Sequence, residues 1–205
     1  NYKINKSLAI ELNKLFLEVI VSNGFDKEAL KLLKKKKNLR LIDARNYSFK
    51  EILRFISSNE ELLEQTEDLK RFSNKDFKVV SKKKPSPKQM KNLIFAFNIC
   101  RYVKSNAIVL ATNETTVGIG SGQPSRLDSC QIAIDKMKKF INTKEEIVAA
   151  SDAFFPFVDG IEKLVQSGVT AVIQPSGSIR DKEIINFANE TNTILVFSKT
   201  RHFRH

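Results

Sequence analysis

Apolar residues recur along the first part of the chain with two different periods, and the alternation between them predicts the local structure. Residues 6–18 carry leucines at helical spacing and predict an amphipathic helix. The short apolar run 19–21 then predicts a buried strand, and Asp26 is a suitable N-cap for a second helix. Another strand is expected at 39–43, whereas residues 60–74 are polar and charged.

The second half of the chain repeats a strand–helix rhythm. Helices are expected at 88–103, where Ser86-Pro87 provides a start, and at 125–141, 160–167 and 179–192. Strands are expected at 107–112, 116–119, 148–151, 169–174 and 194–197. Strands separated by helices of this length predict a layered α/β sheet with right-handed crossovers. The segment KKKPSP (82–87) is a natural joint, so we expect one subdomain over 1–80 and a second over 81–205.

Composition narrows the class of protein. The chain has 205 residues, of which 41% are hydrophobic and 28% charged, and this is typical of a soluble globular protein. No apolar run is long enough to cross a bilayer, and no signal peptide is visible, although the chain begins at Asn1 and an upstream signal would be unreadable. Cys100 and Cys130 match no zinc spacing and are expected to be buried, reduced thiols of a cytosolic protein.

The net charge of +12 suggests an anionic partner. The lysine runs 34–37 and 82–84 are local and are not interleaved with stacking aromatics, which makes nucleic-acid binding the less favoured interpretation. Solvated surface patches, or a field that attracts small phosphates or carboxylates, explain them better. A basic α/β module that binds RNA or an acidic partner remains the alternative.

Three unusual loops fall near the carboxyl ends of predicted strands, where α/β sheets bind ligands. In GIGSGQPSR (118–126) the glycines allow close backbone approach, and Arg126 opens a helix, so the loop is either an anion site or a structural turn. In SDAFFPFVDGIE (151–162), Phe154, Phe155 and Phe157 either form a slot for a flat ring or belong to the core. Asp159 is a ligand-binding candidate, or it caps the following helix.

The third loop, QPSGSIRD (174–181), contains small residues whose backbone N–H groups could bind a carboxylate or carbonyl. The alternative is a plain N-cap by Ser178, with Asp181 at N3. In KSNA (104–107), Asn106 is either a turn residue or a source of amide N–H groups for a developing oxyanion. The sequence contains no G-x-S-x-G, Walker A, H-E-x-x-H or zinc-deaminase motif.

Taken together, KSNAIVLA, GIGSGQPSR, SDAFFPFVDGIE, QPSGSIRDKEII and the terminal RHFRH resemble the C-terminal part of the AICAR transformylase domain of the bifunctional purine biosynthesis enzymes. FLEVIVS (16–22) and EALKLLKKKKNLRL (28–41) extend the resemblance over essentially the whole chain. One departure lies at 57–63, where the family usually has a Gly-Gly pair and this chain has SSNEELL.

The resemblance implies a fold and a reaction. The fold is a cytidine-deaminase-like three-layer α/β/α unit, zinc-free and duplicated, of which this chain would be a fragment. The reaction is formyl transfer from 10-formyltetrahydrofolate to AICAR in a cytoplasmic homodimer with shared active sites and, usually, an upstream IMP cyclohydrolase domain. The matched motifs disfavour a zinc-free deaminase relative with another substrate, and neither a metal, a membrane nor nucleic acid is implied.

The resemblance also assigns residues to roles. AICAR would be bound by Glu18, Arg126, Phe154 and Arg201, the folate by Asp159, Ser178 and Ile179, and Asn106 would assist the transferred formyl group. The family's catalytic Lys-His pair lies in an upstream K-H-x-N-P-C-G motif that this sequence does not contain. We therefore expect these 205 residues alone to bind ligands poorly and not to catalyse the reaction.

Overall fold

The chain divides into two compact units. The computed structural model describes residues 2–48, 53–70, 72–140, 145–202 and 204. Unit 1 is Asn1–Glu67 and unit 2 is Asp68–His205. The expected division near residue 80 lies further along the chain than the observed one, because strand β5 (Phe77–Val79) pairs with strand β10 (Ile194–Ser198) and so belongs to the sheet of unit 2.

The described residues of unit 1 form two helices and four strands: α1 (Lys6–Asn13), β1 (Val19–Ser22), α2 (Lys27–Leu33), β2 (Arg40–Asp43), β3 (Leu53–Ser58) and β4 (Glu61–Thr66). Strands β1 and β2 pair in parallel, and a small core gathers Ile4, Ala9, Ile20, Ala29 and Leu33. Helix α1 ends before the predicted residue 18, because its last hydrogen bonds tighten to i→i−3 and the next two apolar side chains, Leu15 and Phe16, are exposed.

The hairpin formed by β3 and β4 was not predicted. Its register runs from Leu53 opposite Thr66 to Ser58 opposite Glu61, with Asn59 at the turn. Asn59 has a φ of 52°, a left-handed conformation that asparagine tolerates. The predictions missed the hairpin because its second strand, ELLEQT, is exposed along its whole length and shows no alternation of apolar and polar residues.

Unit 2 contains a six-stranded mixed sheet of order β5-β10-β9-β8-β6-β7. The remaining elements are η1 (Asn74–Asp76), α3 (Pro87–Cys100), β6 (Ile108–Thr112), β7 (Thr115–Gly120), α4 (Arg126–Phe140), β8 (Ile147–Ser151), α5 (Val158–Gln166), β9 (Val169–Pro175) and α6 (Asp181–Glu190). Strands β8, β9 and β10 run parallel, while β6 runs antiparallel to both β7 and β8. Each helix and strand predicted for this half of the chain is present.

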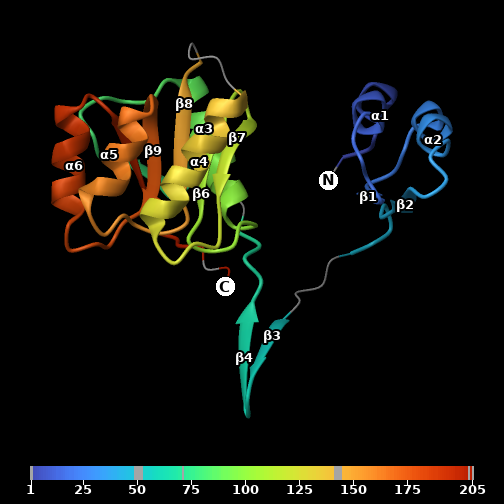
Figure 1. The fold of residues 1–205 in the computed structure, drawn as a ribbon, viewed down its shortest axis with the longest axis horizontal. Helices are drawn as coiled ribbons and strands as arrows, with labels where there is room; N and C mark the ends of the chain where they lie inside the picture. The colour runs from blue at the N-terminus through green and yellow to red at the C-terminus, as the bar shows by residue number, and fades with distance from the viewer. Residues whose placement is uncertain (1, 49–52, 71, 141–144, 203, 205) are drawn as a thin grey trace. The chain divides into compact units, whose positions relative to one another are not determined.

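Helices cover both faces of this sheet (Figure 1). Helices α4, α5 and α6 share one apolar cluster with alternate residues of the strands, and α3 shares a second cluster with the others. Strands β6, β8 and β10 are buried at every position, which explains why they read as continuous apolar runs. Unit 2 is therefore a mixed sheet between two helical layers. Among the described residues, no helix is long and apolar enough to cross a membrane.

Several element ends confirm the local sequence signals. Helix α3 begins with a capping box in which Ser86 and Gln89 satisfy each other's backbone N–H groups, and Pro87 occupies its first turn. Gly168, with a φ of 97°, closes α5. Asn113 and Glu114 turn the chain between β6 and β7. The turn between these strands, the Ser86-Pro87 start of α3 and the closure of α5 by Gly168 lie where they were predicted, although α3 ends at Cys100 and not at 103.

Candidate functional site

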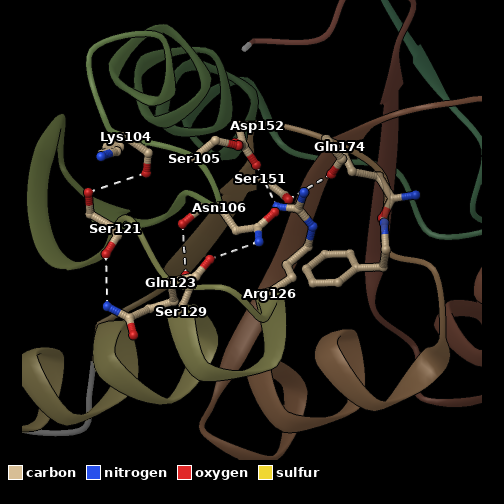
Figure 2. Close-up of polar contacts among 12 residues, drawn as sticks. Lys104, Ser105, Asn106, Ser121, Gln123, Arg126, Ser129, Ser151, Asp152 and Gln174 are labelled. Atoms are coloured by element: carbon tan, nitrogen blue, oxygen red, sulfur yellow. Dashed lines mark hydrogen bonds and ion pairs between the residues drawn. The ribbon is translucent and has the colours of Figure 1, made fainter. Parts of the chain in front are cut away.

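Three segments far apart in the sequence meet at the carboxyl end of strand β8, where Asp152 lies (Figure 2). The Asp152 N–H donates to the carbonyl of Ala107 at the start of β6 (3.2 Å). Its own carbonyl accepts the N–H of His202 in the C-terminal tail (2.9 Å). Asp152 thus joins the KSNA, SDAFF and RHFRH segments through its backbone.

The Asp152 carboxylate is buried and carries two polar partners. One oxygen accepts a hydrogen bond from the Arg126 guanidinium at 2.5 Å, and the other accepts the hydroxyl of Ser105. Only 1% of the Asp152 side chain and 12% of the Arg126 side chain are exposed. Asp152 was not singled out from the sequence, although a carboxylate directly after a buried apolar strand was the available signal.

This pair changes the expected role of Arg126. We expected a helix-start arginine that offers its charge to an anion, but Asp152 already neutralises that charge. Guanidinium has five N–H donors, so Arg126 can still donate hydrogen bonds to a neutral carbonyl or carboxamide. Arg126 therefore suits orientation of a ligand better than attraction of an anion.

Asn106 is held in one amide orientation. Its Nδ2 donates to the backbone carbonyls of Gln123 (2.9 Å) and Pro124 (3.1 Å), and the backbone carbonyl of Asn106 accepts a hydrogen bond from the hydroxyl of Ser129 (2.8 Å; Figure 2). Both amide hydrogens are therefore used, and the expectation that they would stabilise an oxyanion is wrong in this conformation. The Oδ1 atom, which has no hydrogen-bond partner among the described residues, is left to accept a ligand N–H.

The glycines of GIGSGQPSR serve packing. A Cβ on Gly118 would lie 2.1 Å from the carbonyl oxygen of Ala133, and one on Gly120 would lie 1.9 Å from that of Ser129. Helix α4 thus rests directly on the backbone of β7, and this contact places Arg126 at the first position of the helix beside Asp152. The structural interpretation of the first two glycines is the correct one.

The phenylalanines of the loop SDAFFPFVDGIE lie in different environments, one in the core and another at the site. Phe155 is buried and belongs to the core cluster, whereas Phe154 is half-buried. The guanidinium carbon of Arg201 lies 4.6 Å from the centre of the Phe154 ring. On another side, Arg201 approaches Gly177, whose Cβ position would be 3.4 Å from Nη2. The structure therefore brings the predicted residues Phe154 and Arg201 together.

The third loop is already closed on itself. The Asp181 carboxylate accepts the N–H groups of Gly177 (2.8 Å) and Ser178 (3.3 Å), and the Ser176 N–H donates to the carbonyl of Ser198. The expectation that these three N–H groups are available to a ligand is wrong. Ser178 is not the N-cap of α6 either, because the helix begins at Asp181 after Arg180.

The remaining predicted residues are exposed. Asp159 lies in the first turn of α5 and accepts the N–H of Gly160 at 2.7 Å, close to the capping interpretation. Ile179 is fully exposed, and the Arg180 guanidinium lies 4.7 Å from the ring centre of exposed Phe157. Glu18 belongs to unit 1, where it is exposed just before β1. Its part in the site stays a prediction.

A separate cavity lies beside helix α3, away from these residues. It measures about 500 Å³ and is lined by Asn74, Pro87, Lys91, Ile94, Phe95, Asn98 and Glu114. None of the predicted site residues contacts it. We therefore assign the chemistry to the polar cluster around Asp152. Within the described part of the chain, no group of three or more His, Cys, Asp or Glu could hold a metal ion.

Both cysteines are buried and free, as predicted. Burial raises the pKa of the Cys130 thiol to about 12 and that of the Cys100 thiol well above its ordinary value. Neither thiol is therefore ionised near neutral pH, and neither is suited to nucleophilic chemistry.

Comparison with known proteins gives one consistent result. A family model described as the AICARFT/IMPCHase bienzyme matches residues 1–136. The chain is 42% identical over 206 residues to the "bifunctional purine biosynthesis protein PurH" of Caldicellulosiruptor saccharolyticus, which covers 100% of this chain and 39% of that protein. Proteins of the same name from Aquifex aeolicus (42% over 205 residues) and Persephonella marina (43% over 209) likewise cover 100% of this chain and 40% of their own length. The chain thus spans about two fifths of the length of these relatives.

Proposed function

Because this chain belongs to the AICARFT/IMPCHase bienzyme family, we propose that it supplies part of a site for formyl transfer to AICAR in purine biosynthesis. The observation that carries the proposal is the cluster around Asp152. It gathers KSNA, GQPSR, SDAFF and RHFRH, four of the motifs that resemble the transformylase domain, at one end of one sheet.

The proposed reaction joins the exocyclic amine of AICAR to the formyl carbon of 10-formyltetrahydrofolate. A C–N bond forms, a tetrahedral oxyanion develops, and the bond to N10 of the folate breaks, giving formyl-AICAR and tetrahydrofolate. The amine loses a proton and tetrahydrofolate gains one. An amine conjugated with an aromatic ring is a poor nucleophile, so the main contribution of the protein is to hold it in line with the formyl carbon.

Asn106 suits the amine side of this reaction. With its Nδ2 held by two carbonyls, its Oδ1 accepts a hydrogen from the amine and turns the nitrogen lone pair towards the formyl group. The free N–H groups of Arg126 donate to the carboxamide of AICAR. Stabilisation of the oxyanion falls to other groups, and we place the proton-transfer residues outside this chain.

We assign the two substrates to different residues of these loops. Phe154 and Arg201 offer a flat ring and a cation to the AICAR nucleotide, and Glu18 would contact its base end. For the folate, the exposed Asp159 carboxylate accepts N–H groups of the pterin, with Ser178 and Ile179 at the rim. We further propose a cytoplasmic homodimer with shared active sites and a zinc-free, cytidine-deaminase-like fold.

The test is formyl transfer by a full-length enzyme that carries this sequence. Asn106→Ala should lower kcat by about a hundredfold, the scale of losing one orienting polar group at a reacting centre. Asn74→Ala, at an exposed position that lines the separate cavity, is the matched control and should leave kcat within about twofold. An unchanged kcat in Asn106→Ala, or an equal loss in both variants, contradicts the proposed site.

The alternative function, a basic module that binds RNA or an acidic partner, can be tested with the same protein preparation. Lys34, Lys35 and Lys37 are exposed at the end of α2, and the chain carries a net charge of +12. Binding to RNA would weaken steeply with salt and ignore folate analogues. Binding that responds to AICAR and folate analogues supports the enzyme instead.

A further inference from the structure

We propose that His202 and Asp68 form a clasp that positions Arg201, making His202 a positioning residue for the nucleotide. The clasp is the hydrogen bond between the His202 imidazole and the Asp68 carboxylate. The inference rests on the proposed function in one respect, namely that Arg201 binds AICAR. Neither residue of the clasp was among the predicted site residues.

The His202 side chain is buried in an aromatic pocket. It is 1% exposed, and its ring centre lies 4.4 Å from that of Phe97 and 5.3 Å from that of Phe72. Its Nδ1 bonds Asp68, whereas its Nε2 is buried with no hydrogen-bond partner among the described residues. The polar contact of the ring is therefore made by one nitrogen alone.

The protonation state follows from this geometry. Burial lowers the pKa of His202, and Asp68 offsets only part of that effect. The neutral ring carries its hydrogen on Nδ1, because the Asp68 carboxylate can only accept. A second hydrogen on Nε2 would be buried against Phe72 and Phe97 without an acceptor, which is costly.

The tail is fixed on both sides of Arg201. The N–H of His202 donates to the Asp152 carbonyl (2.9 Å), and the carbonyl of Arg204 accepts the N–H of Ser105 (2.8 Å). Before Arg201, the hydroxyl of Thr200 accepts a hydrogen bond from Lys70 (3.2 Å). The backbone that carries Arg201 is thus tied to the start of β6, to Asp152 and to the segment around Asp68.

Asp68 is itself held in place. The Arg101 guanidinium at the end of α3 donates to the carbonyls of Lys70 (2.7 Å) and Asp68 (3.4 Å). The Arg201 side chain, by contrast, is exposed and stacks on one ring. The position of its guanidinium therefore depends on where its backbone lies, and the clasp next to it sets that position.

The hydrogen bond between Asp68 and the His202 ring constrains the position of the C-terminal tail more than apolar packing alone could. An aliphatic side chain could fill the pocket between Phe72 and Phe97, but it would not fix the rotation or the register of the tail. A buried polar contact can specify one arrangement among several. Loss of the clasp should then disturb nucleotide binding more than folding.

Two substitutions at one position separate these roles in a full-length enzyme that carries this sequence. Asparagine places its amide nitrogen near the position of Nδ1 and can still donate to Asp68. Glutamine reaches towards the position of Nε2, where no partner lies. His202→Gln should raise the KM for AICAR about tenfold, the scale of one hydrogen bond to a charged group, with kcat and the folate KM within about twofold. His202→Asn should keep all three constants within about twofold of wild type.

A second variant and a second readout guard against misfolding. Asp68→Ala removes the acceptor from a residue that is 32% exposed, and it should raise the AICAR KM as His202→Gln does. Backbone amides of residues 199–202 should exchange with deuterium faster in His202→Gln and Asp68→Ala than in His202→Asn.

Equal kinetics for the Gln and Asn variants, or a parallel rise of both KM values, overturns the clasp. If wild-type enzyme transfers no formyl group, the proposed function fails. The clasp is then judged by exchange alone, and unchanged protection of residues 199–202 in both His202→Gln and Asp68→Ala overturns it.

Discussion

At the residue scale, Asp152 shows how a buried charge organises this site. A carboxylate that is 1% exposed would be costly alone, and here it is stabilised by the Arg126 guanidinium and the Ser105 hydroxyl. Such a pair adds little net stability compared with apolar packing, but losing one partner leaves the other charge buried and unpaired. Arg126 is therefore strongly dependent on Asp152.

We expect Asp152→Ala to lower the free energy of unfolding by about 3 kcal/mol, because the Arg126 charge loses its buried partner. Denaturant unfolding of the chain measures the change. Asp128→Ala, at an exposed position on the same helix as Arg126, should change stability by less than about 0.5 kcal/mol. Equal losses in the two variants would show that the ion pair is not the cause.

The depressed pKa of His202 predicts a pH dependence of stability. Its ordinary value is 6.5, and burial lowers it in the folded chain. Below pH 6.5 the unfolded chain binds more protons than the folded one. The free energy of unfolding is thus highest above pH 6.5 and falls as the pH drops towards the folded pKa, by at most about 1.4 kcal/mol per pH unit.

Denaturant titrations of wild type and His202→Asn at pH 7.5, 6.5 and 5.5 check this. Asparagine does not titrate, so the loss between pH 6.5 and 5.5 should be smaller in the variant. The titrations of Asp43 and Asp76 do not contribute between pH 5.5 and 7.5, because their lowered pKa values lie below 3.8. Parallel pH profiles would exclude His202 as the source.

At the scale of elements, the packing of α4 on β7 connects the fold to the site. Gly118 and Gly120 leave no room for a side chain under the helix backbone. Arg126 is the first residue of that helix. The distance between helix and strand therefore decides whether Arg126 reaches Asp152.

Gly120→Ala should destabilise the chain by about 3 kcal/mol, because its methyl group would meet the Ser129 carbonyl. In a full-length enzyme it should also raise the AICAR KM, since α4 must move. Gly168→Ala is the matched control. Gly168 has a φ of 97°, but a Cβ added there would meet no atom within 4 Å beyond its chain neighbours, so that variant should cost about 1 kcal/mol of strain and leave KM unchanged. Similar effects in both variants would argue against the close contact as the cause.

At the scale of the whole molecule, the two units differ in how much core they contain. Both large apolar clusters lie within unit 2, and the small cluster of five buried residues lies within unit 1. Unit 1 also exposes large apolar side chains on its strands, among them Val21, Ile42, Phe55, Leu62 and Leu63. A core this small stabilises a domain only marginally.

We therefore expect residues 68–205 to fold alone and residues 1–67 not to. Separate expression and thermal unfolding followed by circular dichroism test this. Unit 2 should unfold in one cooperative transition, whereas unit 1 should show none. A cooperative transition for residues 1–67 alone would contradict this expectation and would mean that the small core of unit 1 is sufficient for independent folding.

The sequence predictions succeeded for features set by neighbouring residues and failed for features set by contacts between separate segments. Local signals located the capped start of α3 at Ser86, the closure of α5 at Gly168 and every predicted element of unit 2. The β3–β4 hairpin was missed because cross-strand pairing, and not pattern, defines it. The boundary near residue 80 differed from the observed division because β5 finds its partner in β10, more than a hundred residues later.

The sequence by itself determined the alternation of helices and strands in unit 2, the family and the motifs that gather at the site, because these depend on local periodicity and residue identity. Only the tertiary structure decided which polar atoms remain available, because the way the chain folds, and not residue identity, selects the partner of each donor. Asn106 Nδ2 is used by Gln123 and Pro124, Arg126 by Asp152, and the Gly177 and Ser178 N–H groups by Asp181. The His202–Asp68 contact spans 134 residues, so no local pattern could have indicated it.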